Sequence, residues 1–396
     1  MARLWPVIPR GSQSRTRPRN RNPTASLFAY NYQMRKTMML QDHSPPEPVV
    51  QGWPEGGLES VPICPLCRGR DRRLLYRGLR DRVCGCAPGQ WTLYCCSACG
   101  AGYLDPRPSV STIGLAYSRY FTHKSPGAGQ PQHSIWRKYR VAQRNAYLNA
   151  FYGYALTPAT RRPPRWLSNT RRQRFDNYAG SLHYPGRGAR LLDVGCGNGD
   201  FLLRMRSLGW EVCGVEPDSK SAAKAVAAGL DVRVGSLETQ PLGSAHFDAI
   251  TLTHVIEHLH DPLVTLRSCL QLLKPGGVIC VATPNLEGKG HRLFGADWLG
   301  LDPPRHLILF TIASLRDSLR LSGFEADPAF LVRLTAKVMF LGSRRVRNGM
   351  DPMRDKPALP LRARLQVAWL AWHADRATLV EPELTEELAV VARRPI

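Results

Sequence analysis

One glycine-rich run constrains the fold of this chain more than any other feature. The run Leu191–Asp200 joins a short apolar stretch to a helical pattern, and the chain repeats this alternation after it. We expect strands at Arg190–Val194, Glu211–Val215, Val232–Val234, Phe247–Leu252, Gly277–Ala282 and Glu387–Arg393. Helical segments between several of these strands indicate βαβ units. The sequence therefore predicts an α/β domain in which helices cover both faces of a parallel sheet.

Three glycines, Gly195, Gly197 and Gly199, lie where the first strand turns into a helix. Their missing side chains let backbone approach a ligand, as in dinucleotide-binding loops. The acid Glu216 ends the next strand, at a spacing suited to ribose hydroxyls. Asp193 argues against a dinucleotide or a plain tight turn, because a carboxylate beside the turn would repel a pyrophosphate. It suits a ligand with cationic amino and sulfonium groups, such as S-adenosylmethionine.

Four motifs follow one another within residues 188–325. They are Leu191–Asp200, Gly214–Asp218, Phe247–His258 and Leu272–Gly277. In content and order they resemble the consecutive motifs of class I S-adenosylmethionine-dependent methyltransferases, with a catalytic domain of the ubiquinone and sugar methyltransferase type. The resemblance implies a doubly wound, mostly parallel, Rossmann-like sheet of seven strands whose last strand runs antiparallel.

The resemblance also implies where the cofactor binds. Asp193, Gly195 and Gly197 line the methionine moiety in this arrangement, Glu216 holds the ribose, and residues 236–238 flank the adenine. The full set that we expect to bind S-adenosylmethionine is Asp193, Gly195, Cys196, Gly197, Gly199, Glu216, Pro217, Ser236, Leu237, Glu238, Thr253 and His254.

Candidate catalytic residues must lie near the carboxyl ends of the strands, where open α/β sheets bind ligands. His254, Glu257 and His258 follow the fourth strand. His306 lies in the long loop after the fifth strand, which also contains Trp298 and Arg305. In similar methyltransferases a Pro-Arg-His segment faces the acceptor, so His306 is the best single candidate for a general base. The alternatives are that Glu257 and His258 only orient the following helix, and that His306 is structural.

Seven of the eleven cysteines lie within Cys64–Cys99. Two Cys-x-x-Cys pairs, Cys64/Cys67 and Cys96/Cys99, have the spacing of a closed, structural zinc site. The ligand set is open because three further cysteines compete, namely Cys84, Cys86 and Cys95. Redox or incidental cysteines are the alternative. A metal site of thiolates indicates a reducing compartment, and we expect the cytoplasm.

Composition divides the chain into four parts. We expect a basic, Pro-rich and unstructured tail over residues 1–60, a zinc-ribbon-like knuckle module over 61–108, a helical connector over 109–186 and the methyltransferase domain over 187–396. The acid-free start is compatible with an organellar transit peptide. We favour instead a start codon placed too early, so that residues 1–38 stand outside the mature protein.

The formal net charge of +23 favours an anionic substrate or surface, although the first 41 residues supply a large part of it. The module layout resembles that of bacterial sugar C-methyltransferases, so we expect a small-molecule or sugar and glycan-pathway acceptor. Two other classes remain open. One is a nucleic-acid methyltransferase that grips through its basic connector and zinc module, and the other is a catalytically inactive, cofactor-binding partner protein.

The chain contains no run of about 18 apolar residues, so we expect no transmembrane segment. Residues 361–374 carry leucines and two tryptophans at helical spacing beside arginines. This pattern is compatible with an amphipathic helix on a membrane surface. We favour a helix that packs on the domain or in a homodimer.

Overall fold

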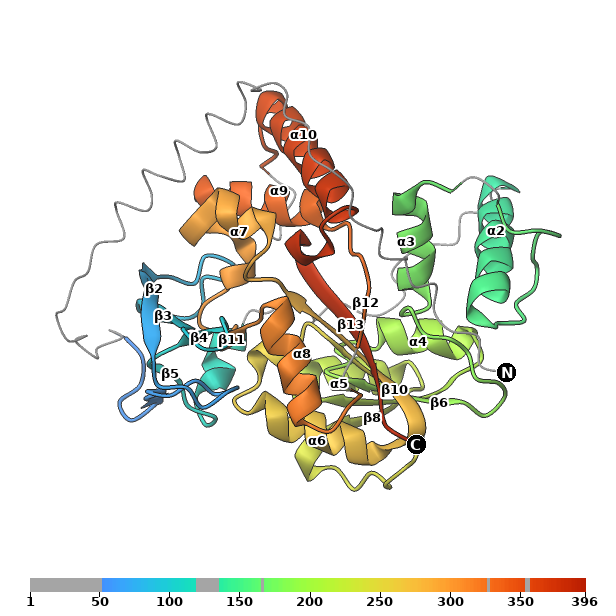
Figure 1. Ribbon diagram of the computed structural model, residues 1–396, viewed down its shortest axis with the longest axis horizontal. Coiled ribbons are helices and arrows are strands. Elements are labelled where there is room, and N and C mark those ends of the chain that lie inside the picture. The colour runs from blue at the N-terminus through green and yellow to red at the C-terminus, as the bar shows by residue number, and fades with distance from the viewer. Residues whose placement is uncertain (1–51, 119–134, 165–166, 326–327, 353–356) are drawn as a thin grey trace, which may run out of the picture. The chain divides into compact units, whose positions relative to one another are not determined.

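A computed structural model describes residues 52–118, 135–164, 167–325, 328–352 and 357–396 of the chain (Figure 1). Its largest sheet has seven strands in the order β12-β13-β10-β9-β6-β7-β8. In chain order they are β6 (Arg190–Val194), β7 (Glu211–Glu216), β8 (Asp231–Val234), β9 (Phe247–Thr253), β10 (Leu273–Pro284), β12 (Ala329–Phe330) and β13 (Glu387–Arg393). The order reverses between β6 and β9, and such a switch point is where open α/β sheets bind ligands.

The sheet is parallel from β8 to β10 and antiparallel at its other end. β6 pairs in parallel with β7 and β9, and β9 pairs in parallel with β10. β13 runs antiparallel between β10 and β12. The predicted mostly parallel, seven-stranded sheet with an antiparallel last strand is therefore confirmed. Since β13 runs the other way, its first residue, Glu387, pairs with Pro284 at the carboxyl edge of β10.

Helices connect these strands, and nearby side chains cap the N-termini of several of them. They are α4 (Asp200–Ser207), α5 (Ser219–Ala227), α6 (Pro262–Leu272), α7 (Lys289–Phe294), α8 (Ile312–Leu321), α9 (Ala336–Arg347) and α10 (Leu361–Thr378). The connections β6-α4-β7 and β9-α6-β10 run in opposite directions along the sheet. Right-handed crossovers therefore place α4 and α6 on opposite faces. The carboxylates of Asp218 and Asp261 cap α5 and α6, and Thr311 forms a capping box with Ser314 in α8.

Short turns of 3₁₀ helix lie in the loops at the carboxyl edge and beside it. They are η3 (Leu237–Thr239), η4 (Ile256–His258), η5 (Gly295–Asp297), η6 (Leu299–Leu301) and η7 (Pro382–Leu384). None of the described helices is long and apolar enough to cross a membrane.

The N-terminal described residues form a second, four-stranded sheet with the order β11-β4-β3-β2. Three of its strands are β2 (Arg72–Leu79), β3 (Trp91–Cys96) and β4 (Gly102–Leu104), while β1 (Leu58–Glu59) pairs separately with β5 (Arg107–Pro108). The fourth strand, β11 (Ile308–Leu309), comes from the loop after α7 and pairs antiparallel with β4 (Figure 1). The loop expected to face the acceptor is thus built into the N-terminal sheet.

Packing begins earlier than the tail predicted over residues 1–60. Trp53 is buried against Trp91, with ring centroids 5.2 Å apart, and its Nε1–H donates to the carbonyl of Gly57. These contacts make residues 52–60 part of the folded structure. Burial of the large Trp53 indole stabilises the turn from Trp53 to Gly57. The rest of that predicted tail lies outside the described residues.

Among the described residues, three helical segments lie between the N-terminal sheet and β6. They are η1 (Ile113–Tyr117), α2 (Ile135–Tyr152) and α3 (Asn169–Tyr178). The carboxylate of Asp176 in α3 accepts hydrogen bonds from the hydroxyls of Tyr147 and Tyr152, which joins α3 to α2. The helical periodicity of this stretch thus corresponds to real helices in the part that the structure describes.

Candidate functional site

The glycine-rich turn between β6 and α4 adopts backbone angles that favour glycine. Gly195, Gly197 and Gly199 have φ values of +71°, +55° and +83°. A Cβ on Gly195 would lie 2.5 Å from Val255, and one on Gly199 would lie 2.4 Å from Leu230. The outer two glycines are therefore required by packing as well as by conformation.

Asp193 lies in β6 directly before this turn. Its side chain is buried, and Thr251 Oγ1 donates a hydrogen bond of 2.6 Å to Asp193 Oδ1. Burial raises the pKa of Asp193 to about 7, although the Thr251 hydrogen bond opposes the shift. A buried carboxylate of this kind gains from a cationic partner, because the partner offsets the cost of keeping the charge out of water.

Glu216 ends β7 and holds the turn in place. Gly197 N–H donates to its Oε2 at 2.7 Å, and Asp218 N–H donates to its Oε1 at 2.9 Å. Burial raises the pKa of Glu216, while these two N–H groups lower it. Each carboxylate oxygen keeps a second lone pair, so two ligand hydroxyls can still be accepted.

The other residues predicted to bind the cofactor lie along the same edge of the sheet. The sulfur of Cys196 packs against Gly214 in β7, so closely that a Cβ on Gly214 would lie 2.5 Å from that sulfur. Leu237 is buried in η3, and the Glu238 carboxylate accepts a hydrogen bond from Thr265. The other predicted side chains here are exposed, namely those of Pro217, Ser236, Thr253 and His254.

His254 follows β9 in a conformation that side-chain-bearing residues rarely adopt, with a φ of +54°. Its Nδ1 lies 3.4 Å from Glu257 Oε1, and its Nε2 lies 3.8 Å from Glu387 Oε1. Partial burial would lower the pKa of His254, but these two carboxylates raise it to about 9. Strained residues of this kind gather at functional sites. Glu387 was not predicted, and its only sequence signal is its place directly before the last apolar alternation.

Glu257 and His306, which are buried, and His258, which is half-buried, form a group beside His254. The Glu257 side chain has no exposed surface; its Oε2 accepts from Thr283, and its Oε1 makes no hydrogen bond within the described residues. His306 Nε2 lies 4.0 Å from that Oε1. Burial would raise the pKa of Glu257, but the surrounding histidines lower it to about 2. Burial and the neighbouring His306 lower the pKa of His258 to about 4.

Backbone carbonyls orient both of these histidines. The Nδ1 of His258 lies 2.9 Å from the carbonyl of Arg305, and the Nδ1 of His306 lies 2.8 Å from the carbonyl of Gly300. A carbonyl only accepts, so each Nδ1 carries a proton, and in the neutral ring each Nε2 keeps a lone pair. One ligand atom from each of these histidines and from Glu257 lies within 4.8 Å of the others, a grouping able to hold a metal ion.

The four cysteines predicted to bind zinc lie together. Their ligand atoms all fall within 4.8 Å of one another, with Cys64 and Cys99 sulfurs 3.6 Å apart and Cys67 and Cys96 sulfurs 3.5 Å apart. The competing Cys95 sulfur instead faces the carbonyl of Gly100 at 3.6 Å.

The two Cys-x-x-Cys turns have matching backbone hydrogen bonds. Cys64 N–H donates to the carbonyl of Gly69, and Cys96 N–H donates to that of Ala101, each at 2.9 Å. Arg68 and Gly100, one residue after each turn, both have positive φ. Two equivalent turns that face each other with four sulfurs fit a tetrahedral ion of the zinc type.

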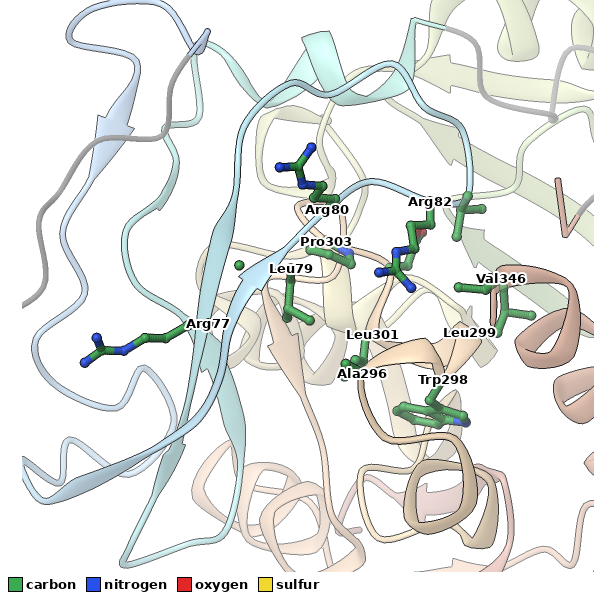
Figure 2. Close-up of a pocket in the computed structure, with 13 residues that line it drawn as sticks. Arg77, Leu79, Arg80, Arg82, Ala296, Trp298, Leu299, Leu301, Pro303 and Val346 are labelled. Carbon is green, nitrogen blue, oxygen red and sulfur yellow. The ribbon is translucent and has the colours of Figure 1, made fainter. Parts of the chain in front are cut away.

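A cavity of about 200 Å³ lies between the end of β2 and the loop that carries His306 (Figure 2). Its lining includes Arg82, Trp298 and Leu301, together with Val346 of α9. No predicted site residue lines it. Figure 2 shows Arg77 and Arg80 with their guanidinium groups turned away from the other lining side chains.

Comparisons with known proteins agree with this geometry. Residues 163–328 match a family model described as a methyltransferase domain. Ubiquinone biosynthesis O-methyltransferases of Cereibacter sphaeroides and Caulobacter vibrioides are 36% and 39% identical over 127 and 135 residues, which cover 30% and 32% of this chain. The same matches cover 51% and 53% of those proteins, so the chain spans about half the length of the curated relatives it matches.

A solved S-adenosylmethionine-dependent methyltransferase from Mesorhizobium loti aligns with a TM-score of 0.37 at 20% identity, over 56% of this chain and 97% of that one. The family match covers the stretch that contains the glycine-rich turn and Glu216. Residues 163–328 are therefore similar to a methyltransferase domain, and the curated relatives are methyltransferases as well.

Proposed function

We propose that this protein transfers a methyl group from S-adenosylmethionine to a hydroxyl of a small-molecule or sugar and glycan-pathway acceptor. The observation that carries the proposal is that a site suited to the cofactor and a group of histidines lie at the same edge of the sheet. Asp193, the glycine turn and Glu216 offer a site for a cationic nucleoside, and the histidine group lies beside them. The names of the curated relatives support an oxygen acceptor.

In the cofactor site, Asp193 faces the amino group of the methionine moiety and Glu216 accepts the ribose hydroxyls. The turn residues 195–199 let the backbone approach the ligand. Residues 236–238 flank the adenine. S-adenosylmethionine supplies the electrophilic methyl group when bound. The raised pKa of Asp193 supports this role, because a cationic ligand stabilises the carboxylate that burial disfavours.

On the acceptor side, His258 and His306 are the candidates for the general base. The carboxylates of Glu257 and Glu387 raise the pKa of His254, which disfavours it as a proton acceptor. The acceptor hydroxyl gives its proton to the free Nε2 of His306 as its oxygen attacks the methyl carbon. The bond between that carbon and sulfur breaks, and the electron pair stays on sulfur. Glu257 stabilises the imidazolium that forms.

We also propose that Cys64, Cys67, Cys96 and Cys99 hold a structural Zn²⁺ ion. Four thiolates close the coordination shell, so the metal has no open position for a substrate. The two matching turns and the close sulfurs support this ligand set. A zinc site of this kind and the other cysteines fit a reducing compartment, which favours the cytoplasm.

As favoured from the sequence, α10 packs on the domain, with Val367, Ala371 and Ala374 in a core cluster that includes Phe340 of α9. For its other side we propose a membrane-surface contact. Leu361, Leu365, Trp369 and Trp372 are each more than half exposed on one side of α10. Arg362 and Arg364 lie between the first two leucines of this stripe in the sequence, and their positive charge suits anionic lipid. Flotation with anionic and with neutral vesicles tests it, using Leu365→Ser as the variant. Self-association at the concentrations used, without vesicle binding, would favour a homodimer instead.

The methyl-transfer proposal is tested by two measurements on one preparation. We expect the folded, zinc-loaded protein to bind S-adenosylhomocysteine in calorimetry. We then expect labelled methyl transfer from S-adenosylmethionine to one member of a panel of hydroxyl acceptors that begins with sugar nucleotides. Absence of S-adenosylhomocysteine binding contradicts the proposal. Tight binding without turnover on any acceptor class would favour an inactive cofactor-binding protein. Methyl transfer to nucleic acid would favour a nucleic-acid methyltransferase.

A further inference from the structure

Arg305, expected to contact an acceptor, is instead enclosed by partners from two distant segments. Its side chain has no exposed surface. Its guanidinium donates to both carboxylate oxygens of Asp302 and both of Asp81. It also donates to the carbonyl of Ala116 at 2.9 Å. Such paired hydrogen bonds fix the plane of the guanidinium and therefore the backbone that carries it.

Asp81 is itself held rigidly in the N-terminal part of the chain. Its carboxylate accepts the backbone N–H groups of Cys84, Cys86 and Ala87, each at 3.0 Å. Burial would raise the pKa of Asp81, but Arg305 and these N–H groups hold it well below its ordinary range. An ionised carboxylate with this many donors is preorganised before it meets Arg305.

The segment that Arg305 anchors is the one that orients His258 and His306. The carbonyl of Arg305 accepts from the Nδ1 of His258, and His306 follows Arg305 in the chain. The Tyr117 hydroxyl lies 2.9 Å from the same His258 nitrogen. Asp302, the second partner of Arg305, lies 3.9 Å from His306 Nε2. Two residues of the N-terminal part, Asp81 and Tyr117, therefore act on atoms that fix the acceptor side.

We infer that Asp81 and Tyr117 are positioning residues for methyl transfer: through Arg305 and by direct contact, they hold His258 and His306 in the tautomer that presents Nε2 to the acceptor. This inference rests on the proposed function. It assigns the cysteine-containing segment a part in the acceptor step, in addition to any role in folding.

A matched contact elsewhere separates positioning from simple attachment. The Tyr76 hydroxyl lies 2.9 Å from Nε2 of His291, and the Nδ1 of His291 faces the carbonyl of Leu286. This pair also joins β2 to the loop and helix after β10, yet His291 is outside the group formed with Glu257. Tyr76→Phe therefore removes a tyrosine–histidine contact between the same parts of the chain without touching the acceptor side.

The test is nitrogen NMR of histidine side chains in the full chain, with Asp81→Asn, Tyr117→Phe and Tyr76→Phe compared with wild type. A fixed tautomer gives separate frequencies for its N–H and its lone-pair nitrogen, and a mixture averages them. We expect Asp81→Asn to move the His258 and His306 frequencies toward each other, and Tyr117→Phe to move those of His258. Tyr76→Phe should change only His291. Calorimetry should find S-adenosylhomocysteine affinity unchanged in all three.

Unchanged His258 and His306 frequencies in both variants would overturn the inference, and so would equal changes in Tyr76→Phe. If Asp81→Asn does not fold, Tyr117→Phe decides alone, since it removes one hydroxyl from a half-buried ring. Loss of S-adenosylhomocysteine binding in the variants would also overturn it, because their role would then be structural for the whole chain. Failure of wild-type binding would instead count against the proposed function, so the two failures are distinguishable.

Discussion

The cofactor side and the acceptor side of the candidate site are assembled in different ways. On the cofactor side, the turn after β6, Glu216 at the end of β7 and η3 after β8 come from three successive βα connections. Their contacts are short in sequence, as in the hydrogen bond from Gly197 N–H to Glu216. On the acceptor side, His258 meets Tyr117 from one end of the chain, and His254 meets Glu387 from the other.

This difference teaches that the two sides can fail separately. Contacts between distant segments form only after the chain pays the entropy of closing long loops, so the acceptor side depends on the rest of the fold. The cofactor side needs only the parallel part of the sheet. The predictions below therefore disturb one side at a time, or the contact between the two.

Removal of zinc is expected to have the largest effect and to act on the acceptor side. Binding of a structural Zn²⁺ contributes on the order of 10 kcal/mol to folding of small sites, so a strong chelator should unfold much of residues 61–104. Hydrogen exchange of this segment should rise by orders of magnitude. S-adenosylhomocysteine affinity, measured by calorimetry on the same sample, should persist.

Cys96→Ser and Cys95→Ser form the matched pair for this prediction. Cys96 belongs to the four-sulfur group and Cys95 does not. We expect metal analysis to find zinc lost from the first variant and kept in the second. If chelation abolished cofactor binding as well, the two sides would be one cooperative unit and the comparison would fail.

Asp193→Ala is expected to have the next largest effect, confined to the cofactor side. Loss of a buried charge-assisted hydrogen bond costs about 3 kcal/mol, which corresponds to about 100-fold weaker S-adenosylhomocysteine binding. Asp200→Ala, in the exposed first turn of α4, serves as the control and should change the affinity little. Equal loss in both variants, by calorimetry, would argue against a specific role for Asp193.

The regular part of the fold was predictable from local patterns. Strands β6 and β13 begin and end at the expected residues, Arg190–Val194 and Glu387–Arg393, because apolar side chains fill both faces of a buried strand. β10 begins earlier than the expected strand Gly277–Ala282, at Leu273 directly after α6 ends at Leu272, and its register is irregular up to Val278. Two-residue strands such as β11 carry no periodic signal and were not expected.

Site residues that lie close together in the sequence could be predicted, and those brought together from distant segments could not. The residues of the glycine turn and Glu216 could be named because one motif contains or closely follows each of them. Arg305 looked like a substrate contact, since nothing in the sequence links it to Asp81, 224 residues away. Glu387 was missed although an antiparallel last strand was expected. The direction of β13 brings its first residue to the carboxyl edge of the sheet, but nothing in the sequence links that residue to His254.

Gly195→Ala probes the contact between the two sides, because a Cβ there would lie 2.5 Å from Val255 on the acceptor side. Gly56→Ala is a matched control, with a φ of +68° against +71° and open space around its Cβ position. Both variants pay the conformational cost of about 1–2 kcal/mol, and only the first pays about 1–3 kcal/mol more for overpacking. Calorimetry should show weaker S-adenosylhomocysteine binding for Gly195→Ala alone. Equal affinity in the two variants would show that the sides tolerate displacement independently.

The pH dependence of cofactor binding is the sharpest test of the cofactor side. The pKa of Asp193 is raised to about 7, so the unliganded fold favours the protonated carboxyl, and its contribution to stability falls as pH rises toward that value. A cationic ligand selects the carboxylate. S-adenosylhomocysteine affinity should therefore weaken by up to about tenfold for each pH unit below about 7, with proton release on binding visible as a buffer-dependent calorimetric heat. Asp193→Asn has no such group and should bind weakly with a flat profile. A wild-type profile that is equally flat from pH 5 to 8 would mean that Asp193 does not meet the charge of the ligand, and the cofactor side would then rest on Glu216 and the turn alone.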